Sequence, residues 1–327
     1  MTLRLELEPY RTAFSETISN AHTSWRERTG VVLRLTDGSG VVGQGEAAPL
    51  PGYSRETLED ATRALTALDE RRLRELASLE DLGELANAVR AAIPGFVPSA
   101  RFALETALLD RLAQRVRQPL YRLLVPDARP PAKLELAALV SSRDAAQRAL
   151  KAGFSTLKLK LGPSTFDADL ELLRALRREL GAGVRLRLDA NQSLPGDGGH
   201  LAALAELAPE FVEEPFLAGL SLPRSPPVPL ALDESLHVPA FSLTPELVRD
   251  FGVVAAVIKP GLVGGLLRGL ELARDAGAVG LVPIVSHAFE GPIGFRAAQE
   301  LARALGVTSH AAGLAPHAAL GARGLPP

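Results

Sequence analysis

From residue 134 onward, short apolar segments alternate with amphipathic ones at intervals of about 25 residues. The apolar segments have the length and composition of buried β-strands: Leu134–Val140, Thr156–Leu161, Val184–Ala190, Phe211–Glu214, Leu230–Glu234, Val253–Lys259 and Leu281–Ser286. Most of the intervening segments have helical periodicity, as in Asp167–Leu180 and Leu266–Ala276. Alternating strands and helices require right-handed crossovers and a parallel sheet. Seven or eight such units favour an α/β protein with a closed (β/α) barrel over an open doubly wound sheet.

The N-terminal part of the chain has a different pattern, in which strands precede helices. Residues Met1–Glu6 alternate apolar and polar side chains, as a half-buried strand does. Val31–Thr36 and Val41–Glu46 are separated by turn-forming residues, which predicts a β-hairpin. After a proline-containing loop, we expect Ser54 to cap a helix. This order of elements predicts an α+β arrangement.

The size and composition of the chain are sufficient for two such units. Its 327 residues are 46% hydrophobic, which is enough for a large core. The N-terminal pattern is broken at Pro94 and Gly95. We therefore expect an α+β domain over residues 1–95 and a barrel domain over residues 96–300.

Charge and composition indicate a small-molecule partner. The net charge of -2 and the pI of about 6.3 lack the basic footprint of proteins that bind nucleic acid or anionic membranes. The absence of cysteine excludes disulfides, cysteine nucleophiles and thiolate metal sites. No run of about 18 apolar residues predicts a membrane span, and the first residues do not resemble a signal peptide. We expect a cytoplasmic protein with no nucleic-acid or membrane partner, and a homo-oligomer is compatible with the sequence.

Carboxylates recur where three successive predicted strands end. Asp189, Glu213 and Asp233 are separated by one strand-helix unit each. In a barrel, successive strands end side by side at one mouth, where catalytic groups collect. Three carboxylates without cysteine suit a hard divalent cation, and Mg²⁺ fits best. The alternative is that each carboxylate only caps the helix that follows it.

Lysine is rare in this chain, and three of the five lysines lie in the predicted barrel strands. Lys158 and Lys160 are two residues apart, so both side chains point to the same face of a strand, toward the interior. Lys259 ends a strand on the opposite side. Buried amines beside a divalent cation suit a reaction in which the metal stabilises an enediolate and a lysine removes the proton α to a carboxylate. The alternative is that the lysines only pair with the carboxylates.

Together these motifs, in this order, resemble the muconate-lactonising-enzyme branch of the enolase superfamily. They are Lys158-x-Lys160, Asp189-x-Asn191, Glu213-Glu214-Pro215, Asp233-Glu234-Ser235 and Ile258-Lys259-Pro260-Gly261. The resemblance implies a modified TIM barrel, (β/α)7β, with an α+β capping domain that the C-terminal segment, about 300–327, completes. It implies Mg²⁺, or Mn²⁺ as a substitute, bound by Asp189, Glu213 and Asp233. It also implies that neighbouring groups support the metal site, namely Asn191, Glu214 and Glu234.

The N-terminal segment over residues 43–57 is similar to one group of this branch, the o-succinylbenzoate synthases. These enzymes dehydrate 2-succinyl-6-hydroxy-2,4-cyclohexadiene-1-carboxylate in menaquinone biosynthesis. The resemblance implies that Lys160 takes the α proton and then helps the hydroxyl to leave by syn elimination. It implies that Lys259 stays cationic on the opposite face and that Lys158 tunes Lys160 and holds the substrate carboxylate. N-succinylamino acid racemases and dipeptide epimerases share the barrel motifs and are the alternative.

The last predicted strand departs from the pattern of the synthases. It continues as Ser286-His287-Ala288-Phe289, where many synthases have a pair of serines. We expect Ser286 and His287 to contact substrate, with His287 replacing a lost hydroxyl donor, although His287 at a barrel rim without substrate contact is an equal alternative. In the N-terminal domain, we expect a mobile loop over residues 15–28. Trp25, the only tryptophan, lies beside it and either shields the site from water or simply packs.

Overall fold

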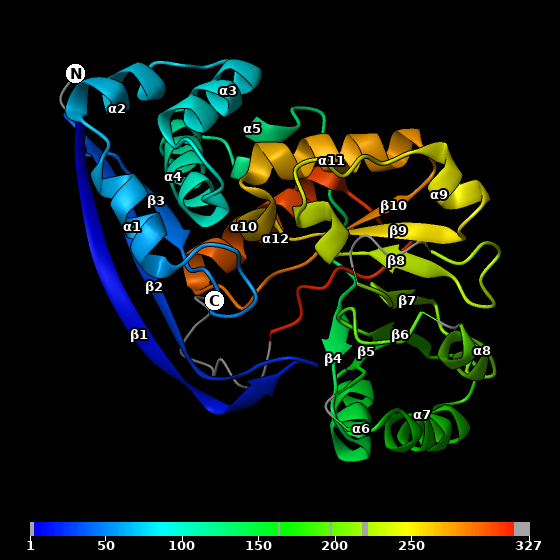
Figure 1. Cartoon of the computed structure of the whole chain (residues 1–327). Coiled ribbons are helices and arrows are strands. Elements are labelled where there is room, and N and C mark those ends of the chain that lie inside the picture. The colour runs from blue at the N-terminus through cyan, green and yellow to red at the C-terminus, as the bar shows by residue number, and fades with distance from the viewer. Residues whose placement is uncertain (1–2, 163, 197, 218–221, 317–327) are drawn as a thin grey trace.

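Two β-sheets form the framework of the protein, in a computed structural model that describes residues 3–162, 164–196, 198–217 and 222–316. One sheet has three strands in the order β1-β2-β3, and the other has seven strands in the order β10-β9-β8-β7-β6-β5-β4. The first sheet is antiparallel, and the seven-stranded sheet is parallel. The protein is therefore a mixed α/β fold in which the parallel sheet curls into at least half a barrel (Figure 1).

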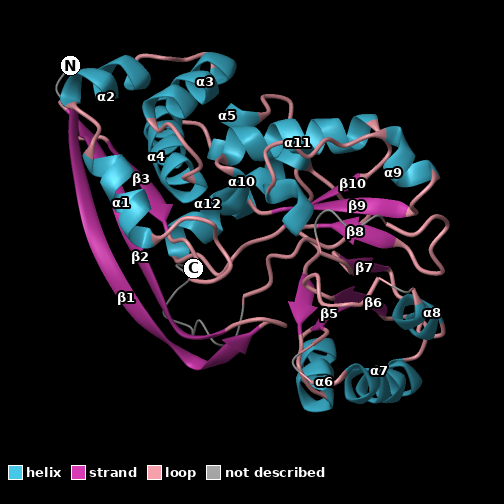
Figure 2. Ribbon diagram, in the orientation of Figure 1, coloured by secondary structure: helices cyan, strands magenta, loops and turns pink. Residues whose placement is uncertain are grey.

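The antiparallel sheet comes first in the chain and is followed by five helices, of which the first and the fourth lie beside the sheet (Figure 2). The strands are β1 (Leu3–Ser19), β2 (Ser24–Asp37) and β3 (Val42–Ala47), and the helices are α1 (Leu58–Thr66), α2 (Glu70–Ala77), α3 (Leu82–Ala92), α4 (Pro98–Val116) and α5 (Leu120–Leu124). The hairpin that we predicted from the turn at residues 37–40 is formed by β2 and β3. Leu33 and Leu35 of β2 are fully buried, because one face of this sheet packs on the helices.

The first helix starts later than we predicted. Ser54 caps no helix; its hydroxyl instead accepts a hydrogen bond from the backbone N–H of Leu50, at 2.8 Å. The helix begins at Leu58, and Thr57 is its N-cap. The Thr57 hydroxyl accepts from the Asp60 N–H, and the Asp60 carboxylate accepts from the Thr57 N–H, which is a capping box. The two reciprocal bonds of this box explain why the start moves three residues beyond Ser54.

Strand β3 and helix α4 approach each other unusually closely through two glycines. A Cβ atom at Gly43 would lie 2.0 Å from the carbonyl oxygen of Ala107, and one at Gly45 would lie 1.8 Å from that of Ala103. Any side chain at these positions would push the helix off the sheet. Helix α4 therefore packs directly on the antiparallel sheet although it lies after residue 95, and the division of the chain at that residue stays a prediction.

The parallel sheet contains all seven strands that we predicted, each at most a few residues shorter. They are β4 (Ala137–Leu139), β5 (Thr156–Lys160), β6 (Arg185–Asp189), β7 (Phe211–Glu213), β8 (Leu230–Leu232), β9 (Val253–Ile258) and β10 (Val282–Val285). The helices that follow are α6 (Arg143–Lys151), α7 (Phe166–Leu180), α8 (Gly199–Ala205), η1 (Glu234–His237, a 3-10 helix), α9 (Pro245–Arg249), α10 (Pro260–Val263), α11 (Leu266–Ala278) and α12 (Pro292–Leu305). Among the described residues between β7 and β8 there is no helix, so the predicted alternation is interrupted there.

A short segment after α12 connects the two edges of the parallel sheet. Ala312 forms a parallel bridge with Leu136, next to β4, and Gly313 forms one with Ser286, next to β10. The Ala137 N–H donates to the Ala312 carbonyl at 2.9 Å, and the Gly313 N–H donates to the Val285 carbonyl at 2.9 Å. Residues 312 and 313 thus occupy the gap between the first and last strands.

Residues 15–28, which we predicted to be a mobile loop, form the far end of a long β-hairpin. Strand β1 continues to Ser19 and β2 starts at Ser24, with a register shift between Ala13 and Ile18. The hairpin runs along one side of the molecule, and its far end reaches the parallel sheet (Figure 1). There the ring Nε2 of His22 lies 2.7 Å from the carbonyl oxygen of Asn191, in the loop after β6.

Among the described residues, no helix is long and apolar enough to cross a membrane.

Candidate active site

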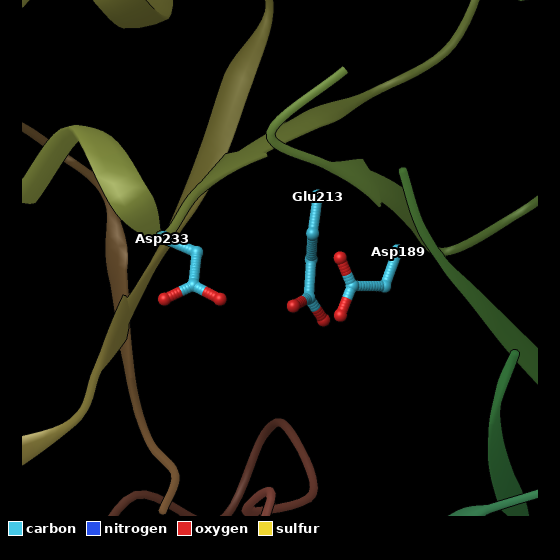
Figure 3. Close-up of side chains that lie close together, drawn as sticks. All are labelled: Asp189, Glu213 and Asp233. Carbon is cyan, nitrogen blue, oxygen red and sulfur yellow. The ribbon is translucent and has the colours of Figure 1, made fainter. Parts of the chain in front are cut away.

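The three predicted carboxylates meet at the carboxyl ends of adjacent strands. Asp189 is the last residue of β6, Glu213 is the last residue of β7, and Asp233 directly follows β8. Their side chains point toward one another (Figure 3), and the nearest oxygens of all three lie within 4.8 Å. None of the three is more than 2% exposed. Parallel pairing places them together, because the sheet aligns Asp189 with Glu213 in register.

This cluster has the chemistry of a site for a hard divalent cation. Three buried carboxylates in such proximity are unfavourable unless positive charge compensates them. Oδ1 of Asp233 is buried and has no hydrogen-bond partner among the described residues. Three carboxylates that present oxygen donors at adjacent strand ends suit Mg²⁺. The three carboxylates can therefore hold the metal that we predicted.

Lys158 lies against two of these carboxylates. Its Nζ atom is 2.5 Å from Oε2 of Glu213 and 2.9 Å from Oδ2 of Asp189. Burial alone would lower the pKa of the Lys158 amine, but the charges of Asp189 and Glu213 outweigh burial and raise it above its ordinary value. Lys158 is therefore held as a cation between these carboxylates, and its role in the reaction stays a prediction.

Lys259 is held on the other side of the cluster, at the end of β9. It forms an ion pair with Asp233 and donates a hydrogen bond of 2.7 Å to the hydroxyl of Tyr53. Burial alone would lower its pKa, but Asp233 and Glu234 raise the pKa above the ordinary value of lysine. Conversely, the pKa of Asp233, which burial alone would raise, is held low by Lys259. Lys259 is also cationic.

Lys160 differs from both of these lysines. Within the described part of the chain it forms no ion pair, and its Nζ atom lies 5.6 Å from the centroid of the Phe289 ring. Burial lowers the pKa of Lys160 to about 8, and the positive charges of Lys158 and Lys259 add to this effect while Asp189 opposes it. Among the three site lysines, Lys160 is the one whose amine can lose its proton near neutral pH.

The residues that we predicted to support the carboxylates contact the loops that carry them. Glu214 accepts hydrogen bonds from the backbone N–H groups of Asp233, at 2.8 Å, and Ser235, at 3.1 Å, and from the Ser235 hydroxyl. Asn191 donates from its backbone N–H to Oδ1 of Asp189 and from its side chain to Oε1 of Glu234, both at 3.1 Å. These bonds fix the turns after β6 and β8. They agree with a supporting role, which stays a prediction.

Glu234 faces inward and is strongly perturbed. Its Oε1 atom accepts from the Tyr53 hydroxyl at 3.1 Å, while its Oε2 atom is buried without a partner among the described residues. Burial and the nearby charge of Asp233 raise the pKa of Glu234 to about 8, and Lys259 opposes the shift. A cavity of about 200 Å³ is lined in part by Glu234, Tyr53, Gln192 and His237.

Ser286 and His287, which we predicted to contact substrate, both have partners within the protein. The Ser286 hydroxyl donates to the carbonyl of Gly313 at 3.1 Å, across the edge of the sheet. Nδ1 of His287 accepts from the backbone N–H of Phe289 at 3.0 Å, and the His287 ring packs edge-on against Phe289 and Phe295. Their contact with substrate stays a prediction.

Sequence reasoning gave no role to several residues that the fold brings to this site. Tyr53 comes from the loop after β3 and bridges Lys259 and Glu234. Nε2 of His237 lies 3.5 Å from Oδ1 of Asp233, and burial lowers the pKa of His237. The spacing of His237, four residues after Asp233, is the signal that could have placed it one helical turn away. For Tyr53, no local signal exists, because its partners are about two hundred residues away in the chain.

A curled parallel sheet with a buried carboxylate cluster and three lysines at its carboxyl end defines an α/β enzyme acting on small molecules. Comparison with known families identifies it further. Residues 141–323 match the family described as enolase C-terminal domain-like, and residues 4–110 match the MenC N-terminal domain. The chain belongs to the enolase superfamily.

Relatives within the superfamily carry out more than one reaction. The chain is 32% identical over 251 residues to the o-succinylbenzoate synthase of Thermosynechococcus vestitus, covering 72% of this chain and 69% of the relative. It is 30% identical over 311 residues to the L-Ala-D/L-Glu epimerase of Bacillus subtilis, covering 90% of this chain and 81% of the relative. The solved structure of the Methylococcus capsulatus dipeptide epimerase, complexed with Mg and a dipeptide, superimposes with a TM-score of 0.77 at 26% identity, covering 94% and 88% of the two chains.

Proposed function

We propose that the protein is an o-succinylbenzoate synthase, a Mg²⁺-dependent carbon-oxygen lyase. It would convert 2-succinyl-6-hydroxy-2,4-cyclohexadiene-1-carboxylate to o-succinylbenzoate in menaquinone biosynthesis, in the cytoplasm. One observation carries this proposal: of the three site lysines, Lys158 and Lys259 are each held by carboxylates, whereas Lys160 has no ion pair among the described residues. The site thus offers one amine free to exchange a proton. The match of residues 4–110 to the MenC N-terminal domain supports the same choice.

A syn elimination needs one acid-base group. In the proposed reaction, the Lys160 amine takes the proton α to the substrate carboxylate, and the resulting ammonium gives that proton to the departing hydroxyl on the same face. One C–H bond and one C–O bond break, a C=C bond forms, and water is released. Lys259, which directly follows β9 across the parallel sheet from β5, keeps its charge and stabilises the negative charge that develops opposite Lys160.

The carboxylate cluster supplies the metal site in this proposal. Asp189, Glu213 and Asp233 would hold Mg²⁺, with Mn²⁺ as a substitute. When bound, the metal supplies positive charge next to the substrate carboxylate. Lys158 lies between Asp189 and Glu213, where it balances their charge and adds a cation beside Lys160. Glu214 and Asn191 keep the metal-binding carboxylates in place through the hydrogen bonds to their loops.

Epimerisation or racemisation on the same site is the second candidate. It is favoured because the alignment with the Bacillus subtilis epimerase covers more of this chain than the alignment with the synthase does, and because the fold is shared with a dipeptide epimerase. That reaction needs an acid-base group on each face of the substrate, so Lys259 would have to release a proton as well. Its ion pair with Asp233 and its bond to Tyr53 oppose that release.

The deciding experiment incubates the purified protein and Mg²⁺ with the cyclohexadiene substrate, and in parallel with N-succinylamino acids and dipeptides in D₂O. Formation of o-succinylbenzoate, followed by ultraviolet absorbance, is the expected result. If no aromatic product forms while the α protons of an N-succinylamino acid or a dipeptide exchange and its configuration is inverted, the synthase proposal is wrong. Isothermal titration calorimetry with Mg²⁺ tests the metal site separately, and Asp233→Asn is expected to weaken binding.

A further inference from the structure

Arg28 connects the loop after β3 to the loop after β10. Its guanidinium is 1% exposed and donates to the carbonyls of Phe289, at 2.7 Å, and Pro49, at 3.0 Å. It also donates to the carbonyl of Ala48 and contacts that of Ala288, at 3.4 Å. These acceptors belong to segments about 240 residues apart in the chain. Only a planar fork of several N–H donors can bind carbonyls of both loops at once.

Phe289 is held in an unusual backbone conformation where Arg28 binds it. Its φ angle is +58°, in the left-handed region that residues with a Cβ atom rarely adopt. Two hydrogen bonds hold this conformation: the Phe289 carbonyl accepts from Arg28, and its N–H donates to Nδ1 of His287. A non-glycine residue in this region persists only where its surroundings determine it, and such positions cluster at functional sites.

This conformation directs the Phe289 ring toward Lys160. The ring centroid lies 5.6 Å from the Lys160 Nζ atom, within the range of a cation-π contact. The same ring packs against the apolar cluster of the β1–β2 hairpin, which contains Phe14, Ile18 and Trp25. Phe289 therefore joins the hairpin to the amine and covers that side of Lys160 with apolar surface.

We propose that Arg28 is a positioning residue, which holds the loop after β10 against the N-terminal sheet so that Phe289 forms the apolar wall beside Lys160. The inference rests on the proposed function only in that Lys160 removes a proton from the substrate. Apolar cover excludes water from the amine during the reaction. Without the Arg28 guanidinium, Phe289 would leave its left-handed conformation, and its ring would no longer cover the Lys160 amine.

The test compares Arg28→Lys with Arg34→Lys, a control substitution of the same kind on β2. Arg34 is at the surface and pairs with Glu8 at 3.3 Å. Trp25, the only tryptophan, is the probe: its indole donates to the carbonyl of Pro51 at 2.8 Å, and it lies in the cluster that Phe289 covers. We expect Arg28→Lys to shift Trp25 emission to longer wavelength and to increase its quenching by acrylamide, while the control keeps the wild-type values.

The kinetic readout separates positioning from general stability. With circular dichroism and the melting temperature confirming that Arg28→Lys is folded, we expect kcat to fall about tenfold to a hundredfold and KM to change much less. An unchanged Trp25 signal, or a shifted signal with wild-type kcat, overturns the inference. If Arg28→Lys does not fold, Phe289→Ala keeps the arginine and its carbonyl contacts while removing the wall. The same loss of kcat is then expected, and wild-type kcat contradicts the proposal.

The outcome is distinguishable from failure of the proposed function. If the wild-type protein does not turn over the cyclohexadiene substrate, the synthase proposal fails whatever Trp25 reports. The same variants are then assayed for exchange of the α proton of an N-succinylamino acid, which also begins with proton removal by Lys160. A loss of exchange in Arg28→Lys together with a changed Trp25 signal supports the inference, and unchanged exchange contradicts it.

Discussion

At the residue scale, three lysine side chains of the site differ in how readily they lose a proton, because their neighbours differ. Lys158 touches Glu213 and Asp189, and Lys259 touches Asp233, so their ammonium forms are stabilised. Lys160 forms no ion pair among the described residues and has the Phe289 ring beside its amine, and burial lowers its pKa to about 8. Arginine at position 160 would stay charged, which gives a physical reason for lysine at this position in a chain that uses arginine for most of its basic residues.

The first residue-scale prediction concerns pH. Lys160 acts as a base only when it is neutral, and the neutral fraction increases as pH rises through its pKa of about 8. We therefore expect kcat/KM to increase tenfold per pH unit below pH 8 and to level off above it. Lys160→Ala should lower kcat by about a thousandfold or more. A kcat/KM that is independent of pH between 6 and 9, or an Ala variant with near wild-type rate, contradicts the assignment of the base.

Lys259→Arg tests the role of the second amine. The substitution keeps the positive charge, but a planar guanidinium cannot reproduce the compact contact of the amine with Asp233 and the Tyr53 hydroxyl. We expect kcat to fall about a hundredfold while the fold is kept. Lys151→Arg, on the exposed end of α6, is the matched control and should have wild-type kcat. Equal activity of the two variants would show that Lys259 acts only through its charge.

At the scale of single elements, the parallel strands and the β2–β3 hairpin were predictable, and the far end of the β1–β2 hairpin was not. The signal for these strands lies within each segment: β9 is an apolar run directly before Lys259, and β6 alternates leucine with arginine and ends at Asp189. The far end of β1 has mostly exposed side chains, so no apolar alternation marks it as a strand. The carboxylate cluster followed from the strand ends. The contacts of Phe289 did not, because its conformation depends on Arg28, about 260 residues earlier.

An element-scale prediction concerns the segment that fills the gap in the parallel sheet. Arg187 on β6 is 2% exposed, pairs with Glu210 at 2.5 Å, stacks on Phe211 and donates to the carbonyl of Ala311 at 2.7 Å. Arg187→Met keeps the volume but leaves Glu210 and that carbonyl without this donor. We expect the free energy of unfolding, measured in urea, to fall by about 3 kcal/mol.

Arg178→Met is the control for this change, because Arg178 is exposed on α7. We expect its unfolding free energy to stay within about 0.5 kcal/mol of the wild type. If Arg187→Met is as stable as this control, Arg187 does not hold residue 311 in place, and the backbone bridges at residues 312 and 313 close the gap without it.

At the scale of the whole molecule, the N-terminal sheet shares one apolar cluster with helices α11 and α12 and the end of β10, whereas most of the parallel sheet packs in a second cluster. A single apolar cluster contains Leu33 from β2, Phe102 from α4, Leu266 from α11 and Phe295 from α12. Glu46 at the end of β3 accepts from the backbone N–H groups of Gly291 and Gly294 at the start of α12. Because the contacts of Glu46 join residues more than two hundred positions apart, no local sequence pattern could predict them. A shared core of this kind predicts that both parts unfold in one cooperative transition.

Glu105 of α4 provides a test of this coupling through pH. It is 2% exposed, and its Oε1 accepts from the N–H of Leu267 at the start of α11, at 2.9 Å. Burial raises its pKa from 4.5 to about 7, against the opposing effect of these backbone donors. Between pH 4.5 and 7 the folded state therefore binds more protons at Glu105 than the unfolded state does. Stability must then fall as pH rises across this range, by up to about 3 kcal/mol.

Glu105→Gln replaces the carboxyl group by a neutral amide that keeps an acceptor for Leu267 and cannot ionise. We expect the wild type to lose stability relative to this variant as pH rises from 5 to 8, with most of the change before pH 7. The contributions of all other titrating groups to the unfolding free energy cancel in that difference, because both proteins carry those groups. Urea unfolding at four pH values, followed by Trp25 fluorescence and by circular dichroism, measures both quantities. A difference that does not vary with pH would mean that Glu105 is ionised at no cost. Separate transitions for the two probes would mean that the N-terminal sheet unfolds independently of the barrel.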